Sequence, residues 1–238
     1  MTNDMKLYYD YTLSPLGTLF YKTVFSQLEG IQNKAILDFG SGFGFTSNFL
    51  AQHNHVTAVE KDEIMIKHSF QDANYTQIHH DLSAIKAMES NQYDIVTCHL
   101  VLEFVDNPTE ILTELVRVLK KGGLLSIVKH NTNGRIIQAI VQDFDLNEAN
   151  NLLNGGFSFS SAFGDIKYYP NETLLEWTNH QLTLEQTFGV RALASLHNAT
   201  IQSNDNWVND MLTIEKSLCE HPDFIKIAYF NHLLLSKN

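Results

Sequence analysis

The sequence predicts an α/β fold, a doubly wound and mostly parallel sheet of seven strands with a helical or loop cover inserted after the fifth. Three observations predict it. Short apolar runs alternate with longer amphipathic stretches along the chain, as strands alternate with helices. The best apolar runs are apolar on both faces, which is typical of strands in a covered parallel sheet. A glycine-rich turn follows the first run directly.

The individual elements follow from these periodicities. The predicted strands are residues 35–39, 56–60, 75–80, 93–98, 124–129, 189–196 and 229–236. The predicted helices are residues 14–28, 46–52, 62–69, 108–119, 135–143, 172–181 and 207–220. The stretch 147–164 is rich in Asn, Gly and Ser and is predicted to be a loop or a mobile cover.

The helix over 108–119 has the clearest end signals. Asn107 can cap it, Pro108 suits the first turn, and Glu110 stands three residues after the cap. We expect Lys120 and Lys121 to complement its C-terminus and Gly122–Gly123 to end it.

Composition excludes several classes of protein. The 238 residues carry 16 Lys and Arg against 27 Asp and Glu, a net charge of −11, which counts against non-specific nucleic-acid binding. Two cysteines cannot form a disulfide framework. With no signal peptide and no apolar run of membrane-spanning length, the expected location is cytoplasmic, with no membrane partner. His53, His55, His79 and His80 match no compact zinc spacing, so no metal site is predicted.

We expect one domain over 1–238, since no linker interrupts the chain. Within it, residues 1–30 are predicted to form an N-terminal lid or helix, and residues 131–185 a substrate-side insertion. Tyr8, Tyr9 and Tyr11 precede the first predicted helix, where they either cover a ligand or pack the N-terminal segment.

The strongest motif is the turn Asp38-Phe-Gly40-Ser-Gly42-Phe-Gly44, which joins a strand to a helix. Glycines at alternate positions allow positive φ and let a ligand touch the main chain. The helix that follows can offer free N–H groups to an anionic ligand group. The spacing fails the dinucleotide pattern G-x-G-x-x-G from either starting glycine.

Two acids follow later strands. Glu60 ends the second predicted strand, twenty residues after Gly40, where an acid accepts hydrogen bonds from a ribose diol in such folds. Asp81 and Leu82 follow the third strand, where an adenine edge would lie. Asp81 could equally cap the next helix.

These residues resemble the class I S-adenosylmethionine (SAM)-dependent methyltransferases. The resemblance is carried, in order, by ILDFGSGFG at 36–44, VTAVEKD at 56–62, HHDL at 79–82, YDIVTCHLVLEFV at 93–105 and VLKKGGLLSIV at 118–128. It implies the Rossmann-like methyltransferase fold, SAM as cofactor and S-adenosylhomocysteine as product. It also implies that the cofactor is bound by Gly40, Ser41, Gly42, Gly44, Glu60, Lys61, Asp81, Leu82 and His99.

A closer resemblance is to the bacterial tRNA 5-carboxymethoxyuridine methyltransferases. It rests on residues 99–134 and on the later FGVRAL followed by a helix and a strand. The chain departs from that group where it has Gly17-Thr-Leu-Phe20 in place of an arginine-bearing turn. It also lacks the group's Lys/Arg-rich cover over residues 155–164. These basic residues would hold an anionic substrate.

The resemblance implies in-line methyl transfer, in which the protein mainly aligns donor and acceptor. His130 follows the fifth predicted strand and, with Tyr9 and Tyr11, is a substrate-side candidate, with a packed structural role as the alternative. No catalytic residue is assigned, because a base is needed only if the acceptor must lose a proton. The sequence favours a small-molecule acceptor. The alternatives are a tRNA wobble uridine and a non-catalytic SAM-binding protein.

Overall fold

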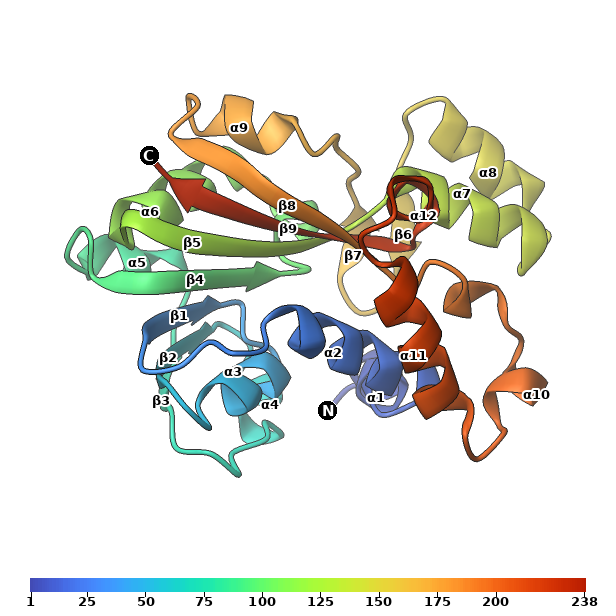
Figure 1. Cartoon of the computed structure of the whole chain (residues 1–238), viewed down its shortest axis with the longest axis horizontal. Helices are drawn as coiled ribbons and strands as arrows, with labels where there is room; N and C mark the ends of the chain where they lie inside the picture. The colour runs from blue at the N-terminus through green and yellow to red at the C-terminus, as the bar shows by residue number, and fades with distance from the viewer. The chain divides into compact units, whose positions relative to one another are not determined.

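The computed structural model describes all 238 residues and contains a seven-stranded sheet and a separate two-stranded sheet (Figure 1). The large sheet has the order β3-β2-β1-β4-β5-β9-β8. Its strands are β1 (Ala35–Phe39), β2 (His55–Glu60), β3 (Thr76–His79), β4 (Tyr93–His99), β5 (Leu119–His130), β8 (Leu182–Val190) and β9 (Phe230–Lys237). The small sheet pairs β6 (Ser158–Ser160) with β7 (Gly164–Ile166) in antiparallel fashion.

Strand directions confirm the predicted mostly parallel sheet. The pairs β1–β2, β1–β4, β2–β3 and β4–β5 are all parallel. Strand β9 runs the other way, because it begins where its two neighbours end. Just before β9, the Tyr229 N–H donates to the Arg191 carbonyl (3.3 Å), and the Asn131 N–H donates to the Tyr229 carbonyl (3.0 Å). In Figure 1 the arrow of β9 accordingly points opposite to that of β4.

The helices include the seven that the periodicity predicts and five more that it does not predict. They are α1 (Asn3–Thr12), α2 (Pro15–Gln27), α3 (Phe45–Leu50), α4 (Glu63–Lys67), α5 (Leu82–Ala87), α6 (Pro108–Val118), α7 (Thr132–Val141), α8 (Leu146–Leu153), α9 (Thr173–Trp177), α10 (Ala199–Gln202), α11 (Trp207–Leu218) and α12 (Pro222–Ile227). The five that the periodicity does not predict are α1, α5, α8, α10 and α12. Two 3₁₀ turns, Leu102–Phe104 and Ala194–Leu196, follow β4 and β8. None of the helices is long and apolar enough to span a membrane.

The chain divides into two compact units, each with its own core. The first unit comprises residues 1–27, 129–169 and 187–232, and the second comprises residues 28–128, 170–186 and 233–238. In the first unit, Leu19, Ala194, Trp207 and Met211 form one buried cluster. In the second, Ile36, Leu50, Val56 and Ile95 do so, which joins β1, β2 and β4 to α3.

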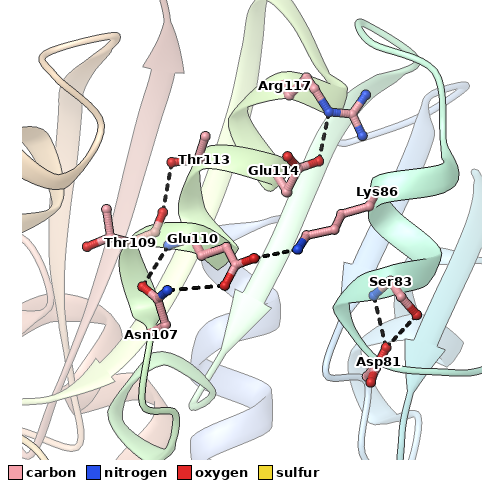
Figure 2. A network of polar contacts seen from close by, with 9 residues as sticks. All are labelled: Asp81, Ser83, Lys86, Asn107, Thr109, Glu110, Thr113, Glu114 and Arg117. Carbon is pink, nitrogen blue, oxygen red and sulfur yellow. Dashed lines mark hydrogen bonds and ion pairs between the residues drawn. The ribbon is translucent and has the colours of Figure 1, made fainter.

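The predicted start of α6 is confirmed in detail. Asn107 Oδ1 accepts from the Glu110 N–H (3.2 Å), and its amide donates to the Glu110 carboxylate (3.1 Å), as Figure 2 shows. Pro108 occupies the first turn of the helix. Lys86 of α5 reaches the same carboxylate. At the other end of α6, Arg117 donates to Glu114 and to backbone carbonyls of Ile85 and Met88. These bonds fasten α5 to α6.

The predicted end signals of α6 are wrong, although the boundary itself is off by only one residue. The helix ends at Val118, and Leu119 is already the first residue of β5, where it pairs with Tyr93. Lys120 binds Asp94 (2.7 Å) and does not complement the helix C-terminus. Gly122 (φ +71°) lies in an irregular stretch of β5, where the register against β4 shifts. Leu119 is fully buried, so the core draws it into the sheet before the glycines are reached.

Four other expectations are corrected. Residues 147–164 are not a loop, because Asp145 caps α8 and Ala149 and Leu152 bury one face of it. The strand predicted over 189–196 lies earlier, as β8. Its first half is partly exposed at the sheet edge and therefore lacks a continuous apolar pattern. Helix α9 is shorter than 172–181, since Asn179 and His180 have positive φ. The three N-terminal tyrosines lie within α1, not before the first helix.

Candidate functional site

The glycine turn of the second unit adopts a conformation that requires glycine. Gly40, Gly42 and Gly44 have φ of +73°, +55° and +76°. A Cβ at Gly40 would lie 2.4 Å from Val101 Cγ2, and one at Gly44 would lie 2.4 Å from the Tyr75 hydroxyl. A Cβ at Gly42 would meet only Met65 Sδ, at 3.8 Å. The turn is therefore tightly packed at both ends and open at its middle glycine.

Asp38 anchors this turn from within the core. Its carboxylate accepts from Ser47 Oγ of α3 (2.5 Å) and from Thr97 Oγ1 of β4 (2.6 Å). Asp38 is almost fully buried, and this burial raises the pKa of its carboxyl. The acid that leads the motif is thus a structural link between β1, α3 and β4, a role that the sequence analysis did not assign.

Glu60 closes the turn from the end of β2. Its Oε2 accepts from the Gly42 N–H (2.8 Å), and its Oε1 accepts from the N–H groups of Lys61 (2.8 Å) and Asp62 (2.9 Å). A carboxylate can accept about four hydrogen bonds, so Oε2 retains one acceptor position. The Glu60 side chain is buried, with only 7% of its surface exposed.

This contact changes the expected chemistry of the turn. The N–H groups of Gly40, Ser41, Gly42 and Gly44 all have partners within the chain, so at these positions the turn offers no free donors to an anion. A buried carboxylate beside the turn would also repel a phosphate. A neutral diol, which can donate to Glu60, suits the site better.

Ser41 supplies an unsatisfied group inside the turn. Its hydroxyl is buried and makes no hydrogen bond within the chain. Leaving a buried hydroxyl unpaired costs about 1–3 kcal/mol, which a ligand with a matching polar atom would recover. Lys61, next to Glu60, contributes its backbone N–H to that carboxylate, and its side chain is exposed.

Asp81 adopts the alternative role that its position allowed, as the cap of α5. Its Oδ1 accepts from the Ser83 N–H (2.9 Å) and hydroxyl (2.7 Å), as Figure 2 shows. These bonds and the contact with His80 lower the pKa of Asp81 to about 2. Asp81 is exposed and Leu82 half-buried, and the second carboxylate oxygen of Asp81 has no partner. The cap leaves that oxygen available.

His99 ends β4 at the same sheet edge. Its Nε2 lies 2.8 Å from Ser126 Oγ of β5, and burial lowers the pKa of the ring to about 3. The imidazole is therefore neutral at physiological pH and a weak base. Leu100, directly after it, has φ +55°, a strained conformation for a side-chain-bearing residue that turns the chain sharply at the strand end.

The substrate-side candidates Tyr9, Tyr11 and His130 all belong to the first unit. The Tyr9 carbonyl accepts from the Thr12 hydroxyl, while the Tyr11 hydroxyl accepts from Arg191 Nη1 (2.5 Å). The His130 ring packs against Phe230 (4.8 Å between centroids) and Tyr229 (5.7 Å). Tyr11 and His130 thus share one cluster, whereas Tyr9 serves the N-terminal helix through its backbone.

Two polar residues in this cluster escaped the sequence analysis. Arg191, almost fully buried, follows β8. Glu215 of α11 is fully buried and accepts from the N–H groups of Ala192, Leu193 and Ala194 (2.8–3.0 Å). Glu215 lies four residues after Met211 and eight after Trp207, on the apolar stripe of the helix, and an acid at such a position was the available signal.

Other reactive side chains are not arranged for catalysis. Cys98 is fully buried, and burial raises the pKa of its thiol far above the usual range, so it is no nucleophile. The structure contains no group of three or more His, Cys, Asp or Glu side chains placed to hold a metal ion.

The chain is also similar in sequence to known proteins. The methyltransferase domain family matches residues 37–127, which include the glycine turn, Glu60, Asp81 and His99. Thiol S-methyltransferase TMT1B of Mus musculus is 30% identical over 143 residues, covering 52% of this chain and 59% of that protein. The first such relatives are matched over about a third to two thirds of their length.

Two further similarities cover most of the chain. The tRNA 5-carboxymethoxyuridine methyltransferase of Escherichia coli O157:H7 is 25% identical over 217 residues, covering 87% of this chain and 82% of that protein. Among solved structures, the plantazolicin methyltransferase BamL in complex with a triazolic desmethylPZN analogue and SAH superposes with a TM-score of 0.60. That match covers 99% of this chain and 90% of the other, at 18% identity.

Residues 37–127 therefore match the methyltransferase domain family, and the chain has the Rossmann-like fold seen in solved SAM-dependent methyltransferases. SAM is the cofactor of this class, and the second unit fits it in three respects. The Ser41 hydroxyl lacks a partner, Gly42 has open space beside it, and Glu60 retains an acceptor position.

Proposed function

We propose that the protein transfers a methyl group from SAM to a small-molecule acceptor. The observation that carries this proposal is the glycine turn closed by Glu60 within the matched methyltransferase domain. A turn whose N–H groups are occupied and whose buried acid accepts hydrogen bonds is suited to a nucleoside and unsuited to a dinucleotide phosphate.

Each residue at this sheet edge has a proposed part. Glu60 accepts from the ribose diol, and Ser41 and the open face of Gly42 border the sugar and the amino-acid end. Lys61 flanks Glu60, and Asp81 and Leu82 border the adenine edge. Gly40 and Gly44 keep the turn in place, and His99 lies beside the cofactor as a neutral ring.

When bound, SAM supplies an activated methyl group on a sulfonium, which a nucleophile takes by in-line displacement. The chain's own contribution is to hold donor and acceptor in line, and orientation can provide up to about 7–11 kcal/mol of the barrier. The low pKa of His99 makes it a poor proton acceptor near neutral pH. The proposed mechanism therefore relies on positioning and assigns no general base.

Charge supports a small acceptor. The net charge is −11, and three lysines are paired with carboxylates of their own chain, in Lys6–Asp10, Lys86–Glu110 and Lys120–Asp94. Cations held in this way are less available to a phosphate backbone, and binding to such a backbone depends on many of them.

The proposal is tested by titrating SAM and S-adenosylhomocysteine into the wild type and Glu60→Ala by calorimetry. Glu60→Ala removes the ribose acceptor and leaves three N–H groups without their partner, so we expect at least about a 100-fold weaker affinity. Glu63→Ala changes an exposed acid three residues away and serves as the matched control. Normal binding by Glu60→Ala would remove the ribose role, and no wild-type binding would end the proposal.

A second candidate is methylation of a tRNA wobble uridine. One observation favours it: the similarity to the tRNA 5-carboxymethoxyuridine methyltransferase spans 217 residues, whereas that to thiol S-methyltransferase TMT1B spans 143. Nucleoside mass analysis of tRNA from a deletion strain tests it, and an unchanged profile would exclude it. Transfer of labelled methyl to any cell-extract component would exclude a non-catalytic SAM-binding role.

A further inference from the structure

Large apolar side chains gather on the outside of α7, α8 and β6 in the first unit. Thirteen large apolar side chains of the protein are exposed, and seven of them lie within residues 140–159, which make up less than a tenth of the chain. The most exposed are Phe144 (79%) and Phe159 (74%). Single exposed apolar residues are normal on a protein surface, but a concentration of this kind marks an interaction site.

The spacing of these residues places them on one side of each element. Leu146 and Leu153 are seven residues apart in α8, about two helical turns, so they share one side of that helix. Phe157 and Phe159 lie on either side of Ser158 in sequence, and they face outward because Ser158 is buried and alternate strand residues point to opposite faces. The surface that we call the α7–β6 face is formed by Val141, Phe144, Leu146, Leu153, Phe157 and Phe159.

Hydrogen bonds hold the three elements in one block. Helices α7 and α8 lie side by side (Figure 1). The Asp145 N–H donates to the Ala139 carbonyl (2.7 Å) across the turn that joins them. The Asn151 side chain donates to the Phe157 carbonyl (2.7 Å) and fixes the start of β6 against α8. The α7–β6 face is therefore carried by a preorganised support, which reduces the entropy lost when a partner binds.

The polar side chains between these elements are enclosed. Arg135 of α7 donates to Asp143 (2.7 Å) and to Glu148 of α8 (3.4 Å), and the Arg135 side chain is largely buried. Ser158 of β6 is buried and donates to the same Glu148 carboxylate. The block thus encloses its polar groups and leaves its phenylalanine rings in water, which is the reverse of the usual distribution. A partner that covered the rings would remove this exposure.

The charges beside the α7–β6 face are negative. Residues 136–166 contain no Lys, Arg or His and four acids, which are Asp143, Asp145, Glu148 and Asp165. Asp165 of β7 is exposed and pairs with Phe159 of β6, so these two side chains lie on the same face of the hairpin. Arg135 offsets only Asp143 and Glu148. An apolar face with an acidic border is complementary to a surface that is apolar and cationic.

Three kinds of occupant could cover such a face, and charge separates them. An anionic lipid surface attracts Lys and Arg beside an apolar face and would repel these acids. A second copy packed face to face would bring Asp145 and Asp165 against the same acids, in a chain whose net charge is −11. A cationic helix of another protein meets neither obstacle. Leu146 and Leu153, about 10.5 Å apart along α8, also match apolar residues seven apart on such a helix.

We infer that the α7–β6 face is a docking site for a cationic amphipathic helix of a partner protein. The helix lays its apolar stripe against the phenylalanine and leucine side chains of this face, and its Lys or Arg side chains lie near Asp145 and Asp165. Recognition of this kind depends on apolar anchors at positions i, i+3 or i+4, and i+7 of the bound helix. The inference is independent of the proposed methyl transfer, because it uses no cofactor residue.

The test uses three synthetic peptides of about 14 residues, or about four helical turns, and measures binding to the full chain by fluorescence anisotropy. The first peptide has Leu at i, i+3, i+4 and i+7 spacing and Lys elsewhere. The second replaces each Lys by Glu. The third has the composition of the first in an order that forms no apolar stripe. We expect the first to bind and the other two to bind at least about 10-fold more weakly.

Variants locate the binding on the protein. Phe144→Ser combined with Leu153→Ser removes two exposed anchors and should weaken binding of the first peptide by about 10-fold or more. Ile214→Ser is the matched control, because it changes an exposed apolar residue of α11 in the same unit (47% exposed), and it should bind like the wild type. Asp165→Asn should weaken binding a few-fold and make it less sensitive to salt, whereas Asp223→Asn, at an exposed acid of α12, should not.

Several outcomes would overturn the inference. They are equal binding of the Lys and Glu peptides, equal binding by the doubly substituted protein and the wild type, and no binding at millimolar peptide. A wild type that sediments as a dimer, with a doubly substituted protein that sediments as a monomer, would assign the face to a second copy. Binding to vesicles of phosphatidylcholine and phosphatidylglycerol that the same substitutions abolish would assign it to a lipid surface.

Discussion

Two bends of this protein are held in the same way but present different chemical groups. In the second unit, the Glu60 carboxylate accepts three backbone N–H groups around the glycine turn. In the first unit, the Glu215 carboxylate accepts three consecutive N–H groups after Arg191. In both, a buried acid satisfies main-chain donors that no regular element can use.

The bends differ in the residue that takes positive φ. Glycines do so in the second unit and leave open space beside Gly42, whereas Arg191 does so in the first unit and brings its own charge. Glu60 also keeps an acceptor position for a ligand, while Glu215 is enclosed. The comparison shows that a buried carboxylate that accepts the N–H groups of a bend can stabilise two kinds of bend. One exposes only backbone, and the other carries a cationic side chain.

The first test of this comparison is Gly40→Ala. A methyl group there would clash with Val101 at 2.4 Å and adopt unfavourable φ, so we expect a loss of about 3 kcal/mol in the free energy of unfolding. Gly30→Ala is the matched control, since Gly30 has φ +84° but nothing within 4 Å, and it should lose about 1 kcal/mol. Urea unfolding measures both. Equal losses would show that packing against Val101 is unimportant.

The second test weakens the corresponding acid of the first unit. Glu215→Gln keeps one acceptor oxygen and replaces the other by a donor that faces N–H groups, so we expect a loss of about 2 kcal/mol in the free energy of unfolding. Glu220→Gln, at an exposed position just after α11, should change it little. An unaffected Glu215→Gln would mean that the N–H groups find other partners.

A third test uses pH to probe the carboxyl edge of β4. The pKa of His99 falls from 6.5 to about 3 on folding. Between these two pH values the His99 ring is therefore protonated in the unfolded chain but neutral in the folded one. The His99 contribution to stability is thus present above pH 6.5 and is lost as the pH falls toward 3. In His99→Gln the unfolding free energy should therefore fall less steeply between pH 6 and pH 4, by up to about 1.4 kcal/mol per pH unit. Parallel curves for the two proteins would show that His99 is solvated.

The smallest expected effect concerns the hydrogen bond between the Tyr11 hydroxyl and Arg191 in the first unit. Tyr11→Phe removes the hydroxyl that accepts from Arg191 but keeps the ring, so we expect the free energy of unfolding in urea to fall by about 1 kcal/mol. Wild-type stability of Tyr11→Phe would show that this hydrogen bond does not stabilise the fold.

The proposed second-unit site could be located in the sequence because its parts are local. The glycine turn directly follows β1, and Glu60 lies twenty residues after Gly40, so the turn and the acid together indicated a ribose-binding position. The first-unit cluster could not. Tyr11 and Arg191 are 180 residues apart, and only the folded chain brings them together.

The misplaced boundaries have equally specific causes. Gly122–Gly123 is a normal helix-stop signal, but the helix ends before it. Leu119 is fully buried as the first residue of β5, so the strand begins three residues before Gly122. Strand β8 was missed because a sheet edge exposes one side of it and mixes polar residues into the run. Asp81 shows the limit of position alone, since an acid at a strand end can be placed there to cap the next helix.

No loop residue separates Val118, the last residue of α6, from Leu119, the first residue of β5. One extra residue inserted there would rotate the helix by about 100° or reverse the inside and outside faces of the strand. Either result would disrupt the apolar stripe of α6 or the pairing of β5 with β4. Engineers who wish to lengthen or label this protein should avoid that junction and use the tip at Gly155, where φ is +78° and a Cβ would meet no atom within 4 Å.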